Sequence, residues 1–157
     1  MRENTRGSRN TSPLNGIDML NLNLVDAFAK YGGKPENRLH SLSAMAADGA
    51  MILGCSATRF GHPAPGVLRY EDNLSRDPRR SAELAALSTH LSLARDGNLP
   101  VRMIIIADKP RPEGNPGREI HIRSDLVGSV VKFDGDHYIV DFVRAGAPAA
   151  AKRQVVR

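Results

Sequence analysis

The sequence predicts a single α+β domain, in which two helices pack on a mixed or antiparallel sheet that includes a C-terminal β-hairpin. Its 157 residues are the length of one domain. Apolar residues recur at helical spacing in two segments, and elsewhere they alternate or form short runs bounded by turn residues, as in strands. Hydrophobic residues make up 41% and charged residues 25% of the chain, an ordinary globular composition.

The two ends of the chain differ from the part between them. Residues 1–16 are polar and rich in Arg, Asn and Ser, which predicts a flexible basic tail. Residues 144–157 form a second basic tail, rich in Ala. The formal net charge is +5, of which the first tail carries +2 and the second +4, so that residues 17–143, the predicted domain, carry −1. We therefore expect any sequence-independent attraction to phosphate to come mainly from the ends.

The first half of the domain is predicted to hold one helix and three strands. In residues 22–31 the apolar side chains lie at helical spacing, and two glycines that can end a helix follow. Residues 39–45 and 50–56 flank an Asp-Gly dipeptide at 48–49 that favours a tight hairpin turn. After a loop rich in Gly and Pro, residues 67–71 form a third strand.

A second helix and the strand after it are the clearest predicted elements. Asp77 can cap the N-terminus of this helix, and Gly97 can end it. Its core-facing residues are Leu84, Leu87, Leu91 and Ala94. Residues 101–107 are almost all apolar, which predicts a strand buried on both faces at the centre of the sheet.

The C-terminal third is predicted to form a loop, a strand and a hairpin. Residues 108–117 contain three prolines and two glycines, as in an exposed loop. Residues 119–123 alternate between polar and apolar, as in a strand with one solvent face. Residues 127–133 and 137–143 flank an Asp-Gly-Asp turn and predict a hairpin, which can expose an edge strand to a partner protein or to a second copy of the chain.

No feature of the sequence indicates a membrane protein or an exported protein. No apolar run approaches the roughly 20 residues that cross a bilayer, and the N-terminus is polar. Cys55 is the one cysteine, so no internal disulfide can form, and a cytoplasmic location is expected. Because Cys55 lies in an apolar stretch, it is predicted to be a small buried residue and not a reactive thiol.

The sequence contains no signature of catalysis, of a metal or of a cofactor. It lacks the glycine motifs of phosphate loops and dinucleotide turns, and its histidines are too far apart for a local metal motif. Glu71 and Asp72 are the best carboxylate pair for Mg²⁺, but adjacent strand residues point to opposite faces, which favours a solvated strand end. An enzyme would require these two carboxylates to meet His121 or Arg69 in one cleft.

The order of elements over residues 22–107, α-β-β-β-α-β, resembles the core of restriction-endonuclease-like nucleases. In those enzymes, an acid on the second strand and a Glu-x-Lys type motif on the third hold a divalent metal beside the phosphate. Here the second strand, residues 50–56, has no acid, and no lysine follows Glu71 in the expected phase. The resemblance therefore implies a degenerate or divergent metal-dependent nuclease.

The remaining signal is a cluster of arginines near the start of the second helix, namely Arg69, Arg76, Arg79 and Arg80. Backbone amides at the start of a helix also attract anions. We therefore predict a non-catalytic binding protein that contacts nucleic-acid phosphates with weak sequence selectivity, through these arginines together with Lys152 and Arg153. The alternatives are a protein-binding inhibitor or adaptor, or a homodimer, and the nuclease described above.

Overall fold

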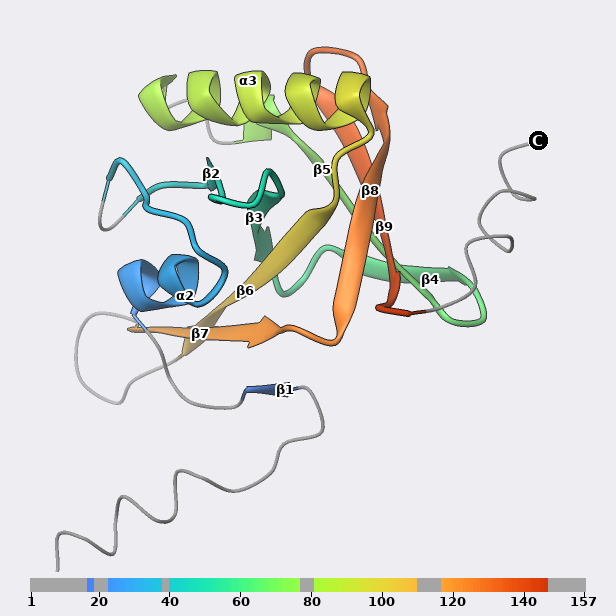
Figure 1. Ribbon diagram of the computed structural model, residues 1–157, viewed down its shortest axis with the longest axis horizontal. Coiled ribbons are helices and arrows are strands. Elements are labelled where there is room, and N and C mark those ends of the chain that lie inside the picture. The colour runs from blue at the N-terminus through green and yellow to red at the C-terminus, as the bar shows by residue number, and fades with distance from the viewer. Residues whose placement is uncertain (1–16, 19–22, 38–39, 77–80, 110–116, 147–157) are drawn as a thin grey trace, which may run out of the picture.

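Two helices pack on one mixed sheet in the part of the chain that the structure, a computed structural model, describes (Figure 1). This confirms the predicted α+β class. The described residues are 17–18, 23–37, 40–76, 81–109 and 117–146. None of the described helices is long and apolar enough to cross a membrane.

The described elements include two helices and a short turn of 3-10 helix between them in the chain, namely α2 (Leu24–Lys30), η1 (Leu74–Arg76) and α3 (Ser81–Gly97). The strands are β1 (Ile17–Asp18), β2 (Ser43–Met45), β3 (Met51–Ser56), β4 (Phe60–Ala64), β5 (Val67–Asn73), β6 (Val101–Lys109), β7 (Gly117–Arg123), β8 (Leu126–Phe133) and β9 (His137–Arg144).

The sheet is mixed, and β6 lies at its centre. The strand order is β1-β7-β6-β8-β9-β5-β4, while β3 pairs with β6 and β2 pairs with β3. β3 and β6 run parallel, from Met51 opposite Val101 to Ser56 opposite Ile106. The other described pairs are antiparallel. Parallel neighbours need a long connection between them, and the chain from β4 to α3 supplies it.

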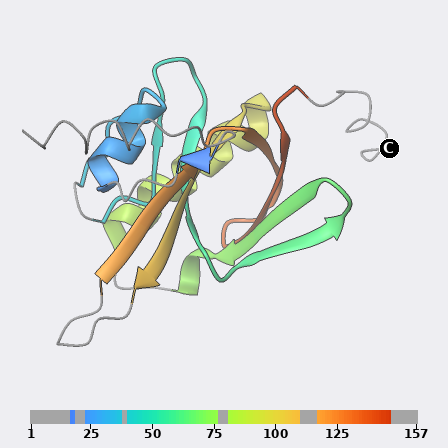
Figure 2. The ribbon, with the colours of Figure 1, turned by 90° about the horizontal axis from the view of Figure 1, so that it is seen from below.

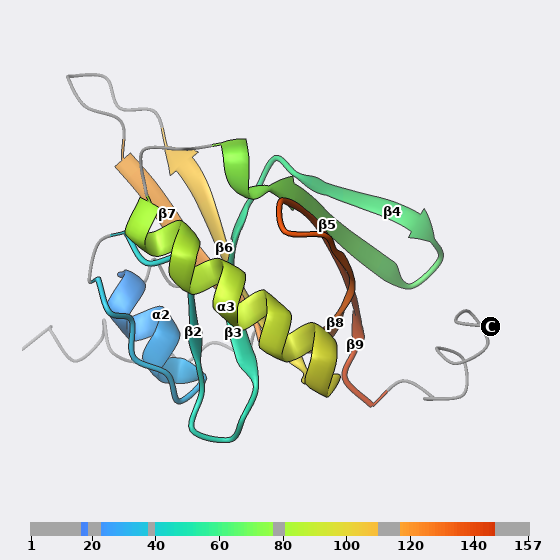
Figure 3. The ribbon, with the colours of Figure 1, turned by 90° about the horizontal axis from the view of Figure 1, so that it is seen from above.

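Two hydrophobic clusters lie on opposite faces of β6. On one face, Leu87 and Leu91 of α3 belong to the same cluster as Met103, and Figure 3 shows α3 lying across the strands there. On the other face, Phe28 of α2 belongs to the same cluster as Ile104. Met103 and Ile104 are adjacent in the strand and both are fully buried, so β6 is covered on both faces, as predicted.

Several predicted elements are confirmed at their expected places. The first hairpin, β2 and β3, turns at Gly49, whose φ of 95° requires the left-handed region. In α3, Leu87, Leu91 and Ala94 are buried as predicted, while Leu84 is half-buried. The predicted cap, Asp77, lies outside the described residues.

The predicted loop between the second and third strands is wrong, because residues 60–64 form β4. This strand pairs with β5, and the hairpin turns at Gly66, whose φ is 78°. Pro63 fits here because β4 is an edge strand, where a missing N–H leaves no ladder hydrogen bond unmade. Four strands thus lie between α2 and α3, so the nuclease-like order of three strands is also wrong.

The C-terminal hairpin is confirmed as β8 and β9, which lie between β6 and β5 in the strand order. β8 pairs with β6 at one position, Gly128 opposite Val101, and β9 pairs with β5 along most of its length. β9 is therefore not an edge strand, while β8 beyond Gly128 has no strand partner on the side of β6 among the described residues. At this end of the sheet the edge is β4, which extends with part of β5 beyond the rest of the described chain (Figure 2).

The boundaries of the last predicted loop and of the C-terminal tail shift slightly. Asp108 and Lys109 continue β6, and Gly117 begins β7, so both ends of the expected loop are strand. β9 runs to Arg144, and the backbone N–H of Ala145 donates to the carbonyl of Asp125 at 2.7 Å. The remaining residues of that loop and of the two tails lie outside the described residues.

Candidate anion-binding pocket

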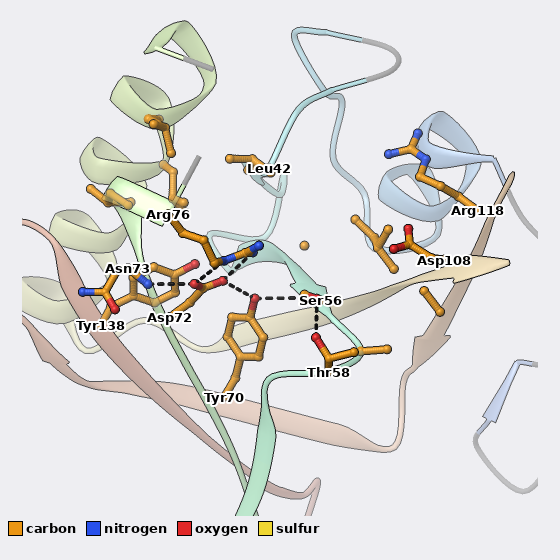
Figure 4. Close-up of a pocket in the computed structure, with 17 residues that line it drawn as sticks. Leu42, Ser56, Thr58, Tyr70, Asp72, Asn73, Arg76, Asp108, Arg118 and Tyr138 are labelled. Atoms are coloured by element: carbon orange, nitrogen blue, oxygen red, sulfur yellow. Dashed lines mark hydrogen bonds and ion pairs between the residues drawn. The ribbon is translucent and has the colours of Figure 1, made fainter. Parts of the chain in front are cut away.

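A cavity of about 390 Å³ opens between α3, β3, β5 and β6 (Figure 4). α3 contributes Leu84 and Leu87 to its wall. β5 contributes Tyr70 and Asp72, and the far side includes Ile106 of β6. The cavity therefore combines apolar side chains with an ionisable group, which is the usual composition of a small-molecule site.

The alternation of β5 determines which of its side chains reach this pocket. Tyr70 and Asp72 share the inner face of the strand, and their exposed fractions are 1% and 3%. Arg69 and Glu71 lie on the outer face, where Arg69 pairs with Asp141 across the strands and Glu71 is exposed. The inner face of β5 thus ends in a buried carboxylate, and this carboxylate needs partners to be stable there.

Four donors surround the Asp72 carboxylate. The Arg76 guanidinium donates twice, from Nε to Oδ1 at 2.7 Å and from Nη2 to Oδ2 at 2.8 Å. The Tyr70 hydroxyl donates to Oδ2 at 2.7 Å, and the backbone N–H of Asn73 donates to Oδ1 at 2.8 Å. Each carboxylate oxygen therefore accepts two hydrogen bonds, which leaves Asp72 poorly suited to act as a base.

These hydrogen bonds keep Asp72 ionised. Burial by itself would raise the pKa of Asp72, but the donors from Arg76, Tyr70 and Asn73 hold that pKa below its ordinary value. The bond to Asp72 raises the pKa of Arg76, and burial raises the pKa of Tyr70. The tyrosine stays protonated and can donate, so the three side chains form a stable network of one anion, one cation and one neutral hydroxyl.

Asp72 fixes one edge of the Arg76 guanidinium and leaves the other edge open. The Arg76 side chain is 43% exposed, and within the described residues Nη1 has no hydrogen-bond partner. A second guanidinium, that of Arg59, has its Nε 3.8 Å from Oδ1 of Asp72 and is 42% exposed. Two guanidinium groups thus lie beside one carboxylate, and one of them, that of Arg76, lines the pocket.

The opposite side of the pocket is also polar. Arg118 and Asp108 lie there, across the cavity from Arg76 in Figure 4, on neighbouring positions of β7 and β6. Ser56, the last residue of β3, and Thr58 also line the pocket, and their hydroxyl oxygens are 3.2 Å apart. This wall offers hydrogen-bond donors and acceptors to a ligand held at Arg76.

Two arginines of the predicted cluster, Arg69 and Arg76, lie among the described residues, and these two occupy different places. Arg76 lines the pocket, while Arg69 lies on the outer face of β5 in a bidentate pair with Asp141, at 2.7 and 2.9 Å. The other predicted contacts lie outside the described residues, namely Arg79, Arg80, Lys152 and Arg153. Of the predicted set, Arg76 is the residue that the described part of the structure places in a cavity.

The carboxylates and histidine considered for an enzyme do not meet in one cleft. Glu71 Oε2 lies 2.6 Å from Nε2 of His137, on the face of β5 opposite to Asp72. His121 lies on β7 with its Nε2 3.4 Å from Oε1 of Glu119. Among the described residues, no group of three or more His, Cys, Asp or Glu side chains is arranged to hold a metal.

Cys55 and Asp72 show what the sequence did and did not reveal about the buried residues near the pocket. Cys55 is fully buried, and burial raises the pKa of its thiol, so the prediction of a buried residue is confirmed. The role of Asp72 was missed, although a signal was present: Tyr70 and Asp72 alternate on one strand face, and Arg76 follows Asp72 by four residues. By contrast, no local pattern marks Ser56, Thr58 or Arg118.

Comparisons with known proteins add little to this geometry. No protein-family model matches the chain, and no curated protein matches it. One solved structure with similarity to this chain is described as a crystal structure of KRYPTONITE in complex with mCHH DNA, H3(1-15) peptide and SAH. The TM-score is 0.32 and the identity 16%, over 85% of this chain and 28% of that chain. The function must therefore be argued from the residues of the chain itself.

Proposed function

We propose that this protein binds nucleic acid without catalysing a reaction, and that Arg76 contacts a phosphate of the ligand. The observation that carries this proposal is the pairing of a buried carboxylate with a half-exposed guanidinium. Asp72 holds the Nε and Nη2 edge of Arg76, and the Nη1 edge remains for a ligand. A guanidinium held in this way loses little conformational freedom when it binds a phosphate.

The charge of the chain supports a polyanion as the ligand. The formal net charge is +5 and the isoelectric point is about 9.8. Arg59 and Arg76 share one carboxylate at the pocket, and the basic tails add further cations. Such cations gain binding energy from a nucleic acid by releasing its counterions. On the sequence argument alone, Arg79, Arg80, Lys152 and Arg153 remain part of the proposed contact set, whereas Arg69 does not, because it lies on the outer face of β5 and outside the pocket.

Fluorescence anisotropy with a labelled duplex tests this function. We expect binding at about 50 mM salt that weakens steeply toward about 200 mM, because each phosphate contact adds about 0.9 to the slope of log affinity against log salt. Arg76→Gln should weaken binding and reduce that slope by about one contact. Arg69→Gln is the control, since it removes an arginine that also makes a bidentate pair with an aspartate but lies on the outer face of β5, outside the pocket. Absence of binding at the lower salt would contradict the proposal.

A protein partner is the second candidate, and one observation bears on it. β4 pairs with β5 on one side, and residues 61–64 are exposed. An exposed edge strand can pair with a strand of another chain. However, Pro63 lacks a donor, and the register of β4 shifts between Gly61 and Ala64. Both features are typical of edges that resist such pairing, so nucleic acid remains the leading ligand.

A further inference from the structure

The pocket is larger than a phosphate requires. Its volume of about 390 Å³ falls within the range of about 300–1,000 Å³ that is common for sites of small organic ligands. Leu42, Leu84 and Ile106 supply apolar surface to it, while Arg76 supplies donors at one end. A ligand that fills this cavity needs an anionic group and also a body with apolar faces.

The polar groups around the cavity can serve both parts of such a ligand. At one end, the open edge of Arg76 can donate to an anionic oxygen, and Arg59 adds positive charge nearby. At the other end, the carboxylate of Asp108 is exposed and can accept hydrogen bonds from a hydroxyl or amino group. A sugar linked to a heterocyclic base carries such groups together with apolar ring faces.

The attachment and charge of a terminal phosphate favour the end of a strand over its middle. α3 forms one wall of the pocket, and the ends of β3 and β6 form the opposite wall. A phosphodiester inside a strand is attached to a nucleoside on both sides, so the strand would have to enter the cavity and leave it again. A phosphomonoester is attached on one side only, and it carries a charge of about −1.5 to −2 at neutral pH, so it interacts more strongly with the open edge of Arg76 than the single charge of a phosphodiester does.

From these observations we infer that the pocket takes one nucleotide with a terminal phosphomonoester, either a free mononucleotide or the 5′-phosphorylated end of a strand. Its phosphate contacts Arg76, and its sugar and base lie against Leu42, Leu84 and Ile106. This inference rests on the proposed function, because it names the part of a nucleic acid that the same site recognises.

The first experiment compares two forms of one 3′-labelled duplex, which differ only in a 5′-phosphate or a 5′-hydroxyl. We expect the phosphorylated form to bind about tenfold or more tightly, as is usual for hydrogen bonds between charged groups. Adenosine 5′-monophosphate should compete for the site, whereas adenosine and inorganic phosphate at the same concentration should compete far less.

Three variants locate this preference in the pocket. Arg76→Gln should abolish the difference between the two duplexes. Arg69→Gln should retain it, because Arg69 makes the same kind of bidentate pair but lies outside the pocket. Ala57 lines the pocket and is exposed, so Ala57→Phe should fill the cavity without changing a charge, and it should also reduce the difference. Circular dichroism checks that each variant is folded.

The outcomes separate this inference from the proposed function. If neither duplex binds and no nucleotide competes, the proposed function fails. If both duplexes bind equally and the monophosphate does not compete, nucleic-acid binding stands and the pocket inference is wrong. Competition by the monophosphate without a preference for the 5′-phosphate identifies a free mononucleotide as the ligand. Equal competition by inorganic phosphate would overturn the inference, because the sugar and base would then contribute nothing.

Discussion

At the scale of single residues, Asp72 decides how the pocket is built. Its carboxylate is 3% exposed, and an ionised group so deeply buried is stable only with paired charge and hydrogen bonds. Arg76 and Tyr70 provide them through the side chains, and Asn73 through the backbone. Asp72 is thus a positioning residue, which acts on a ligand by fixing the orientation of Arg76.

We predict that Asp72→Ala lowers the free energy of unfolding by about 1–3 kcal/mol, because it leaves the Tyr70 hydroxyl without its acceptor in a buried place. Urea unfolding measures this change. Asp141→Ala is the matched control, since it also removes the carboxylate of a bidentate arginine pair, but both partners there are partly exposed. It should cost less than about 1 kcal/mol. Equal costs for the two variants would show that the Asp72 network adds nothing beyond a surface ion pair.

His90 makes the stability of the folded protein depend on pH. Burial lowers the pKa of His90 below its ordinary value, although the charge of Glu36 acts in the opposite direction. His90 Nδ1 lies 2.7 Å from Oγ of Ser43 and links α3 to β2. The unfolded chain binds the proton at a higher pH than the folded protein, so the free energy of unfolding falls as the pH drops from 6.5 through the folded pKa.

We expect His90→Gln to remove this part of the pH dependence. Urea unfolding at pH values above and below 6.5 measures it in the wild type and in the variant. The aspartate and glutamate side chains are the same in both proteins, so the difference between the two pH dependences is the contribution of the His90 imidazole. A wild-type protein that is equally stable on both sides of that pH would contradict the assignment.

At the scale of elements, α3 and the sheet stabilise each other by packing their apolar faces together. Leu87 is 2% exposed, and we predict that Leu87→Ala lowers the free energy of unfolding by about 2–5 kcal/mol through lost burial and a cavity. Leu93 lies on the same helix but is 50% exposed, so Leu93→Ala should change stability by no more than about 0.5 kcal/mol. Urea unfolding of both variants tests whether the predicted stripe is the one that packs.

The C-terminal hairpin requires a glycine at position 128, because there is little space there for a side chain. At Gly128, an added Cβ would lie 2.7 Å from the ring of Phe142 and 3.0 Å from Val140. Gly128→Ala should therefore lower the free energy of unfolding by about 1–3 kcal/mol, because the fully buried Phe142 must move. Gly61→Ala is the control, since an added Cβ there meets no atom within 4 Å. Thermal unfolding that is unchanged by Gly128→Ala would show that the hairpin adapts without strain.

At the scale of the whole molecule, most of the excess positive charge lies at the ends. Truncation to residues 17–146 removes a net charge of +5, which is the entire formal net charge of the chain. The truncated protein should remain folded, because it keeps both hydrophobic clusters. We expect a large loss of affinity for duplex DNA and a flatter salt slope in anisotropy titrations.

The truncated protein also tests how the tails and the pocket divide their roles. Its preference for a 5′-phosphate should persist, because Arg76 and the cavity are intact. An unchanged affinity and salt slope would contradict the role of the tails and would place the contacts on the described domain.

The sequence by itself determined those elements whose signals are local. Helical spacing identified the buried face of α3, turn dipeptides marked both predicted hairpins, and the apolar run of β6 predicted burial on both faces. These signals depend on neighbours a few residues apart, so they can be read along the chain. The tight turn at Gly66 was missed, because the two prolines before it, Pro63 and Pro65, are more typical of a loop.

Only the tertiary structure decided where these elements lie and what they bring together. β5 pairs with β9, so that Arg69 meets Asp141, 72 residues away in the chain, and this pairing separates Arg69 from Arg76. The same pairing places β9 between β5 and β8 in the sheet. The pocket joins Asp72 of β5 to Arg118 of β7 in the same way. Contacts of this kind depend on strand order, which non-local packing determines and local patterns do not encode.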